Sequence, residues 1–200
     1  MIYEMALVDP NNVHVAVTSR GLRQMPYRTR MYGHTMTKFR PALLAVNKQI
    51  NAEAINYLYG HKFIFTGSAA LMGFLFMIGH LNQKRLNVIR IESWGSSRGA
   101  KKVANHSGLT MLGGATNLKS LEIGGMRDRR GPGEKAKLFF KDAHLFIQAF
   151  GIANGAKDAA VDIVELDRAD FPVPYGAKDS LKEEQHQVFQ RRLRNFANSN

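Results

Sequence analysis

The sequence predicts an α/β fold: a helical N-terminal part, then a small, irregular, mostly parallel βαβ sheet, then a C-terminal amphipathic helix. Short β-branched or aromatic runs start near Phe63, Val88, Leu118 and Ala160, and a helical pattern separates each run from the next. Parallel strands need crossovers of this kind. The composition, 44% hydrophobic and 22% charged, is typical of a folded domain. We therefore expect one α/β domain over residues 1–170.

The N-terminal region combines short elements with a basic loop. Residues 1–7 have the pattern of the end of a helix, and residues 9–12 that of a turn. The β-branched run 13–18 predicts a short strand. The basic loop of residues 20–40 follows.

The next segment predicts a helix that leads into a strand. Pro41 suits a first helical turn, and Gly60 suits a left-handed stop. The aromatic run 63–66 then predicts a buried strand. The apolar stripe of the helix consists of Leu43, Val46, Ile50, Ala54 and Leu58.

The rest of the chain alternates between helical and extended patterns. Residues 69–78 are apolar around the whole helix, which indicates burial on most sides or a partner surface. Alternation predicts a strand at 88–93, and the spacing of leucines from residue 109 to the strand at 118–123 resembles a degenerate leucine-rich unit. Residues 138–150 predict an amphipathic helix and 159–166 a further strand.

The C-terminal end is predicted to be a helix joined by a linker. Residues 171–179 have the composition of a linker, and a capping box begins at Ser180. In the helix of residues 180–200 one face is apolar, and we expect this face to dock on the domain. The alternative is a free helix that binds a partner or a membrane surface. The apolar face consists of Leu181, Val188, Phe189, Leu193 and Phe196.

The charge of the chain points to an acidic partner. The net charge is +12 with a pI near 10.1, and residues 10–51 contain basic residues but no acid. This region predicts either a solvated loop or a surface that binds nucleic acid or another polyanion, with cations for the backbone and rings for stacking. The candidate contacts are Arg20, Arg23, Arg28, Arg30, Lys38, Arg40, Tyr27 and Tyr32.

Catalytic and metal-binding patterns are weak. Gly95-Ser96-Ser97-Arg98-Gly99 matches the nucleophile elbow G-x-S-x-G, and Asp162 or Asp167 and then His186 would complete a triad order. The polar segment that follows argues against a hydrolase, which we keep as a remote alternative. The chain has no cysteine, and its histidines lack metal-site spacing, so we predict no cofactor and no metal site.

The remaining composition bears on location. The uncharged stretch 63–83 approaches the length of a membrane span, but its polar residues and glycines favour a strand-to-helix unit. We expect no membrane span. Because the chain lacks cysteine and opens without a signal-peptide pattern, we expect an intracellular protein, cytoplasmic or nuclear.

Two motifs resemble a large group of fungal F-box-like proteins of unknown function. The first is the opening M-I-Y-E-M-A-L, and the second is L-L-A-V-N-K-Q-I-N-A-E-A-I-N-Y-L-Y-G-H-K-F-I-F. The resemblance covers roughly the first 95 residues. The matching positions are Ile2, Tyr3, Met5, Ala6, Leu7, Leu43, Leu44, Val46, Asn47, Gln49, Ile50, Glu53, Ala54, Tyr59, Phe63 and Phe65.

The resemblance implies a non-enzymatic protein-interaction module, similar to the substrate receptor of a ubiquitin ligase. The L-P-x-E-x-R portion, which would dock the ligase adaptor in this family, is not present before Met1. Adaptor binding would therefore need an upstream motif that this chain does not contain. The expected partner is a protein, with nucleic acid as the alternative.

Overall fold

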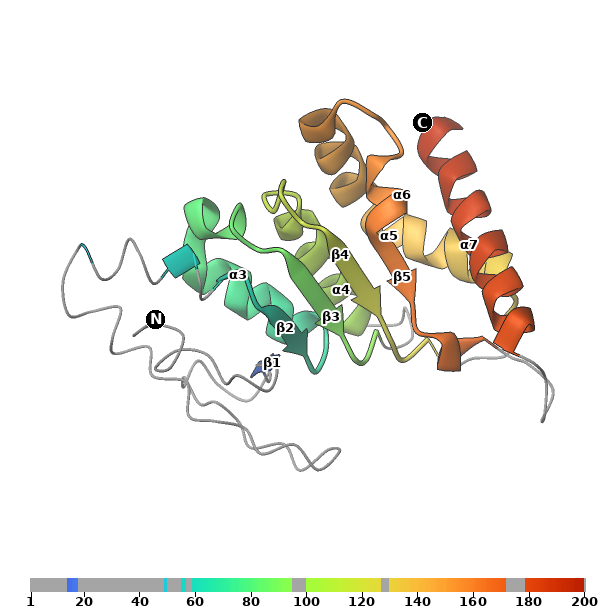
Figure 1. The fold of residues 1–200 in the computed structure, drawn as a ribbon, viewed down its shortest axis with the longest axis horizontal. Helices are drawn as coiled ribbons and strands as arrows, with labels where there is room; N and C mark the ends of the chain where they lie inside the picture. The colour runs from blue at the N-terminus through green and yellow to red at the C-terminus, as the bar shows by residue number, and fades with distance from the viewer. Residues whose placement is uncertain are drawn as a thin grey trace.

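The structure is a computed structural model, shown in Figure 1, and it describes residues 14–17, 49, 55–56, 59–94, 100–126, 130–171 and 179–199. The elements in chain order are β1 (His14–Val17), β2 (Lys62–Phe65), α3 (Ser68–Gln83), β3 (Val88–Ile91), α4 (Ala100–Leu112), β4 (Ser120–Ile123), α5 (Pro132–Asn154), α6 (Ala159–Ile163), β5 (Val164–Leu166), the 3₁₀ helix η2 (Arg168–Asp170) and α7 (Asp179–Ser199). The helix predicted at 1–7, most of the helix predicted from residue 41, and the basic loop lie outside the described residues.

The five strands form one parallel sheet in the order β1-β2-β3-β4-β5. This confirms the predicted α/β class. Each strand pairs with the next one in the chain, so every connection is a crossover between neighbours. Right-handed crossovers between neighbouring strands place their helices on the same face of a sheet. In Figure 1 α3, α4 and α5 accordingly lie behind the sheet.

The pleat separates apolar from polar side chains on β2 to β5. Burial alternates along β2, β3 and β4, with the second and fourth residue of each strand buried. Because these residues are in register, they form one apolar layer under the helices. The layer consists of Phe63, Phe65, Ile89, Ile91, Leu121, Ile123, Val164 and Leu166. We call the opposite side of the sheet, which carries the alternate residues, the open face.

Helix α5 begins and ends at residues whose backbone suits these positions. Pro132 occupies the first turn of α5, and Gly155 ends it in the left-handed conformation with φ 76°. In α3 the helix is kinked at Gly79, which has φ 70°. Only a residue without a Cβ adopts this conformation at little cost.

Helix α7 packs against α5 and thereby covers the β5 end of the core. Phe189, Leu193 and Ala197 are buried, and the Phe189 ring lies 6.2 Å from the ring of Phe139 on α5. The predicted apolar face of this helix is therefore only partly buried, since Leu181 at its start is 42% exposed.

The structure differs from the sequence prediction at two elements. Residues 159–163 form helix α6, and only Val164–Leu166 is a strand, so the strand predicted over 159–166 is wrong in its first half. Helix α5 runs from Pro132 to Asn154, so the helix predicted over 138–150 is too short at both ends. Among the described helices, none combines the length and the apolar character that a bilayer crossing requires.

Candidate functional site

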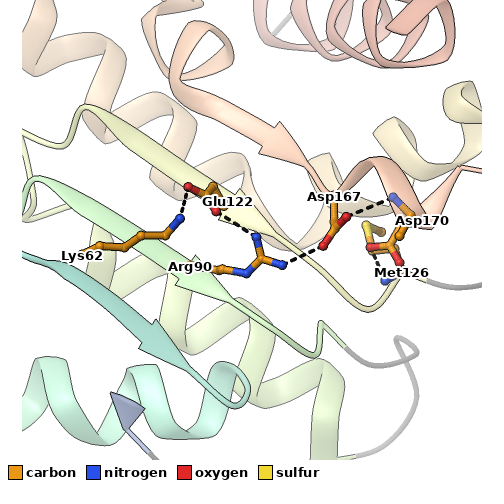
Figure 2. Close-up of polar contacts among 7 residues, drawn as sticks. Lys62, Arg90, Glu122, Met126, Asp167 and Asp170 are labelled. Atoms are coloured by element: carbon orange, nitrogen blue, oxygen red, sulfur yellow. Dashed lines mark hydrogen bonds and ion pairs between the residues drawn. The ribbon is translucent and has the colours of Figure 1, made fainter. Parts of the chain in front are cut away.

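The open face of the sheet carries a chain of paired charges. Figure 2 shows Lys62 of β2, Arg90 of β3, Glu122 of β4 and Asp167, the residue after β5, in front of the strands with helices behind them. Lys62 donates to Glu122, and Arg90 donates to Glu122 at 3.0 Å and to Asp167 at 2.7 Å. Four side chains from successive strands are thus connected across the sheet.

The strand register explains why these side chains meet. Arg90 and Glu122 are direct partners in the parallel pairing of β3 and β4. Lys62 and Arg90 lie on the same face because they alternate with the buried residues of their strands. Arg90 and Glu122 are close enough to pair as neighbours, whereas Lys62 and Arg90 each reach across the strand beside them to Glu122 and Asp167.

Arg90 is the centre of this chain of charges. Burial alone would lower its pKa, but its hydrogen bonds to Glu122 and Asp167 and the charges of both raise the pKa above its usual range. The side chain is 32% exposed, and those of Glu122 and Asp167 are 21% and 29% exposed. These partly buried pairs are less screened by salt than surface pairs are.

Asp167 is held at the carboxyl end of the sheet by its backbone and its second oxygen. Its N–H donates to the carbonyl of Ile123 at 2.8 Å, and its Oδ1 accepts from the N–H of Ala169 at 3.0 Å. A Cβ on the neighbouring Gly124 would lie 3.7 Å from Asp167 Oδ2 and 3.3 Å from the Glu92 carbonyl oxygen. The tight approach at Gly124 is therefore to the backbone after β3, whereas the Asp167 carboxylate would meet a Cβ at ordinary contact distance.

Lys135, Met126 and Asp170 form a buried hydrogen-bonded cluster, here called the clasp, at the carboxyl end of β4 and β5. Lys135, in the first turns of α5, is fully buried and donates to the carbonyl of Met126 at 2.7 Å and to the carbonyl of Asp170. Asp170 Oδ2 accepts from the N–H of Met126 at 2.9 Å, as Figure 2 shows. The Lys135 ammonium also lies 5.8 Å from the centre of the Phe171 ring. The clasp joins the ends of β4 and β5 to α5.

The open face carries both charged and apolar side chains. Besides the paired charges it carries the half-buried apolar Ile64 and Val88, and the exposed Glu92 and Glu165. Arg90 is already bonded to both carboxylates, which suits recognition better than proton transfer. Within the described part of the chain, no group of three or more histidine, aspartate or glutamate side chains could hold a metal ion.

The predicted site residues are only partly described. All eight candidate polyanion contacts between Arg20 and Arg40 lie outside the described residues. Of the family-motif positions, Tyr59, Phe63 and Phe65 are buried in the core, and Gln49 is an exposed helical residue. The Tyr59 and Phe63 rings stack at 6.1 Å. The other motif positions lie outside the described part of the chain.

The residues considered for hydrolysis are engaged elsewhere. Gly95-Ser96-Ser97-Arg98-Gly99 lies outside the described residues. Asp162 pairs with Arg194, and Asp167 pairs with Arg90.

The third member of that triad order, His186, lies in an aromatic setting. Its ring packs against the rings of Phe171 and Phe189, with centroid distances of 6.2 and 6.4 Å. Burial lowers its pKa, and so does the charge of Arg168, whereas Glu183 and Glu165 raise it. The ring is therefore held mainly by packing.

The chain of charges on the open face was not predicted from the sequence. Its signal is one charged residue between apolar neighbours in each run, as in V-I-R-I with Arg90 and S-L-E-I with Glu122. Alternation places such a residue on the polar face but does not say which strands are adjacent. No family model, no curated protein and no solved structure matches this chain.

Proposed function

We propose that this protein is a non-enzymatic interaction module that binds a partner protein through the open face of its sheet. The observation that carries this proposal is the group of linked polar side chains on one side of the sheet, with Arg90 and Glu122 in register and the helices on the other side. Such a surface offers several charged contacts to a partner. Paired charges of this kind set the specificity of an interface more than its affinity.

Exposed apolar side chains on α3 support the same class of function. Phe76 and Leu81 are each 78% exposed, and Met77 is 47% exposed. Clustered large apolar side chains at a surface are typical of protein interaction sites. Phe76 and Met77 lie within residues 69–78, for which the sequence leaves a partner surface as one of two alternatives.

The resemblance to F-box-like proteins suggests the biological setting of the proposal. By this resemblance the module is similar to a ubiquitin-ligase substrate receptor without the intact adaptor-docking motif, and it acts inside the cell. Adding an upstream L-P-x-E-x-R segment should then permit capture of the ligase adaptor. If the extended chain also captures no adaptor from a fungal lysate, the ubiquitin-ligase part of the proposal is wrong.

The open face itself is tested with two charge reversals of equal size. Glu165→Lys changes an exposed residue of β5 on the open face, and Glu134→Lys changes an exposed residue in the first turn of α5. A photo-crosslinker at Ser120 on the open face of β4 reports contact directly, with Thr110 on α4 as the control position. We expect partner crosslinks from Ser120 that Glu165→Lys reduces and Glu134→Lys preserves. Equal loss in both variants, or crosslinks from Thr110 alone, would contradict the proposal.

A further inference from the structure

We propose that the outer surface of α4 and α5 binds the phosphodiester backbone of single-stranded nucleic acid. The site consists of Lys102 and His106 on α4 and Lys141 and His144 on α5. It lies on the helical side of the sheet, and it is independent of the protein-binding role of the open face. It also differs from the basic segment of residues 20–40.

The two histidines form a stacked pair with a defined tautomer. Their ring centroids are 5.5 Å apart, and the ring planes differ by 21°. His106 Nδ1 lies 3.2 Å from the carbonyl oxygen of Asp142, and His144 Nδ1 lies 3.3 Å from that of Lys141. A carbonyl oxygen only accepts, so each Nδ1 carries the hydrogen and donates it. In this tautomer each Nε2 carries a lone pair and can accept from a donor on a ligand, such as the N–H of a base.

The positive charge around this pair is not balanced at the surface. Lys102 and Lys141 are exposed, and their charges and that of His106 all act on one carboxyl group, that of Asp142. Asp142 is only 1% exposed, and this burial raises the pKa of its carboxyl group. A hydrogen bond from Asn105 and the nearby positive charges lower the pKa by a smaller amount. Helix α4 has no acidic residue, and Asp142 is the only acid of α5 after Glu134.

The arrangement fits a strand of phosphates better than a single ion or a lipid surface. Lys137, Lys141 and His144 follow each other along α5 at steps of about 6 and 4.5 Å, because an α-helix rises about 1.5 Å per residue. The Phe140 ring lies 6.5 Å from that of His144 but stacks on Phe196 of α7 at 5.6 Å, so the rings beside the cations are those of His106 and His144. Cations along a row with rings between them suit backbone contact and base stacking.

Lipid binding would require more apolar surface beside the cations. In the described part of α5, the exposed large apolar side chains are Leu145 and Ile152, and Leu145 is only 37% exposed. An interfacial helix buries a continuous apolar face in the bilayer. The apolar residues of α5 instead face the core of the protein, as Phe139, Phe146 and Phe150 do.

The test compares two double variants with the same charge change. Lys102→Gln/Lys141→Gln removes two cations of the site, and Lys119→Gln/Lys157→Gln removes two exposed lysines elsewhere. The probe is a labelled oligo(dT) of about 16 nucleotides, and its binding is followed by fluorescence anisotropy over a range of salt concentrations. Each single-strand phosphate contact contributes about 0.7 to the slope of log K against log salt.

We expect the site variant to lower that slope by about 1.4 and to weaken binding about tenfold at low salt. The control pair should leave the slope within about 0.3 of the unchanged protein. His144→Gln should weaken binding as well. Circular dichroism should show the same helix content in every variant, because the replaced side chains are exposed.

Several results would overturn the proposal. An equal loss of oligo(dT) affinity in both double variants would show that net charge alone determines binding. An unchanged affinity in the site variant would show that Lys102 and Lys141 do not contact the probe. A loss confined to alanine substitution of Arg20, Arg23, Arg28, Arg30, Lys38 and Arg40 would place binding in the basic segment instead. Binding to phosphatidylserine vesicles without binding to oligo(dT) would indicate a lipid site. None of these results bears on the Glu165→Lys test of the open face.

Discussion

Arg90 on β3 reaches across β4 to Asp167 beyond β5, with its Nη2 atom 2.7 Å from Asp167 Oδ2. Its Nη1 atom donates to Glu122 on the strand between them, at 3.0 Å. One guanidinium group therefore connects three strands of the open face. Arginine can do this because its planar group carries donors that point in different directions.

Replacing Arg90 by leucine should destabilise the fold by about 1–2 kcal/mol, because two partly buried carboxylates lose their shared donor. Urea unfolding should show a lower midpoint with an unchanged m-value. Arg168→Leu is the matched control, since its pair with Glu183 is largely exposed at 66% and 43%. That change should cost under about 0.5 kcal/mol. Similar losses in both variants would contradict the central role of Arg90.

Gly125→Ala should be far more harmful than Gly155→Ala, although both residues have positive φ, 83° and 76°. A Cβ at position 125 would lie 2.8 Å from the Glu92 carbonyl oxygen and from Ser93 Cα, whereas position 155 has no atom within 4 Å. We expect a cost of about 1 kcal/mol at 155 from the backbone conformation. At 125 the clash should raise it to about 3 kcal/mol or more.

The measurement is the thermal midpoint of the two variants. For a chain of 200 residues a loss of 1 kcal/mol lowers the midpoint by roughly 2–4 °C. Equal shifts at the two glycines would show that the turn after β4 moves away from β3 to accept a side chain.

Lys135→Met should destabilise the protein by about 3 kcal/mol or more. The methionine would fill a similar volume, but the carbonyls of Met126 and Asp170 would lose a charged donor in a buried setting. Lys137→Met, two residues later and exposed, should change stability by at most about 0.5 kcal/mol. Guanidinium unfolding of both variants checks the difference, and a mild effect at Lys135 would show that the clasp is dispensable.

Stability should fall as the pH is lowered below 6.5, in part through His186. Burial lowers the pKa of this imidazole from its ordinary value of 6.5, so the unfolded chain takes up the proton first. Stability therefore rises with pH between the lowered pKa and 6.5, and His186 adds nothing further above that window. Burial also lowers the pKa of His61, which contributes in the same direction.

His186→Phe should reduce this dependence while it keeps a ring against Phe171 and Phe189. The measurement is the urea midpoint at pH 5 and pH 7.5 for the unchanged protein and the variant. The exposed His80→Phe serves as the control and should leave the difference between the two pH values unchanged. The same difference in the His186 variant would assign the dependence to other groups.

The sequence predicts the fold class and most strands because alternation and helical spacing are local signals. Phe63, Ile89 and Leu121 are buried where their strand patterns place them. The run at 159–163 is different, because Ala160, Val161 and Val164 suit a buried helical turn as well as a strand. Packing of α6 against α5 and α7 decides in favour of the helix. Short apolar runs are ambiguous in this way.

The candidate site was less accessible to prediction, because it depends on which strands are neighbours. Lys62, Arg90, Glu122 and Asp167 are spread over more than one hundred positions of the sequence. Their meeting requires the strand order and the register of three parallel pairs. The stacked histidines of α4 and α5 likewise depend on how two helices pack, and no spacing along the chain indicates that contact.

The chain-order arrangement of the strands also has a consequence for cooperativity. Each helix mainly contacts the next one along the chain, α3 with α4, α4 with α5 and α5 with α7. In proteins built this way, each unit is stabilised mainly by its nearest neighbours. The effect of a local defect therefore decreases with distance along the row. Hydrogen exchange should therefore be slowest at β3 and β4, in the middle of the sheet. Damage to α7 should loosen β5 and α5 well before it reaches β2.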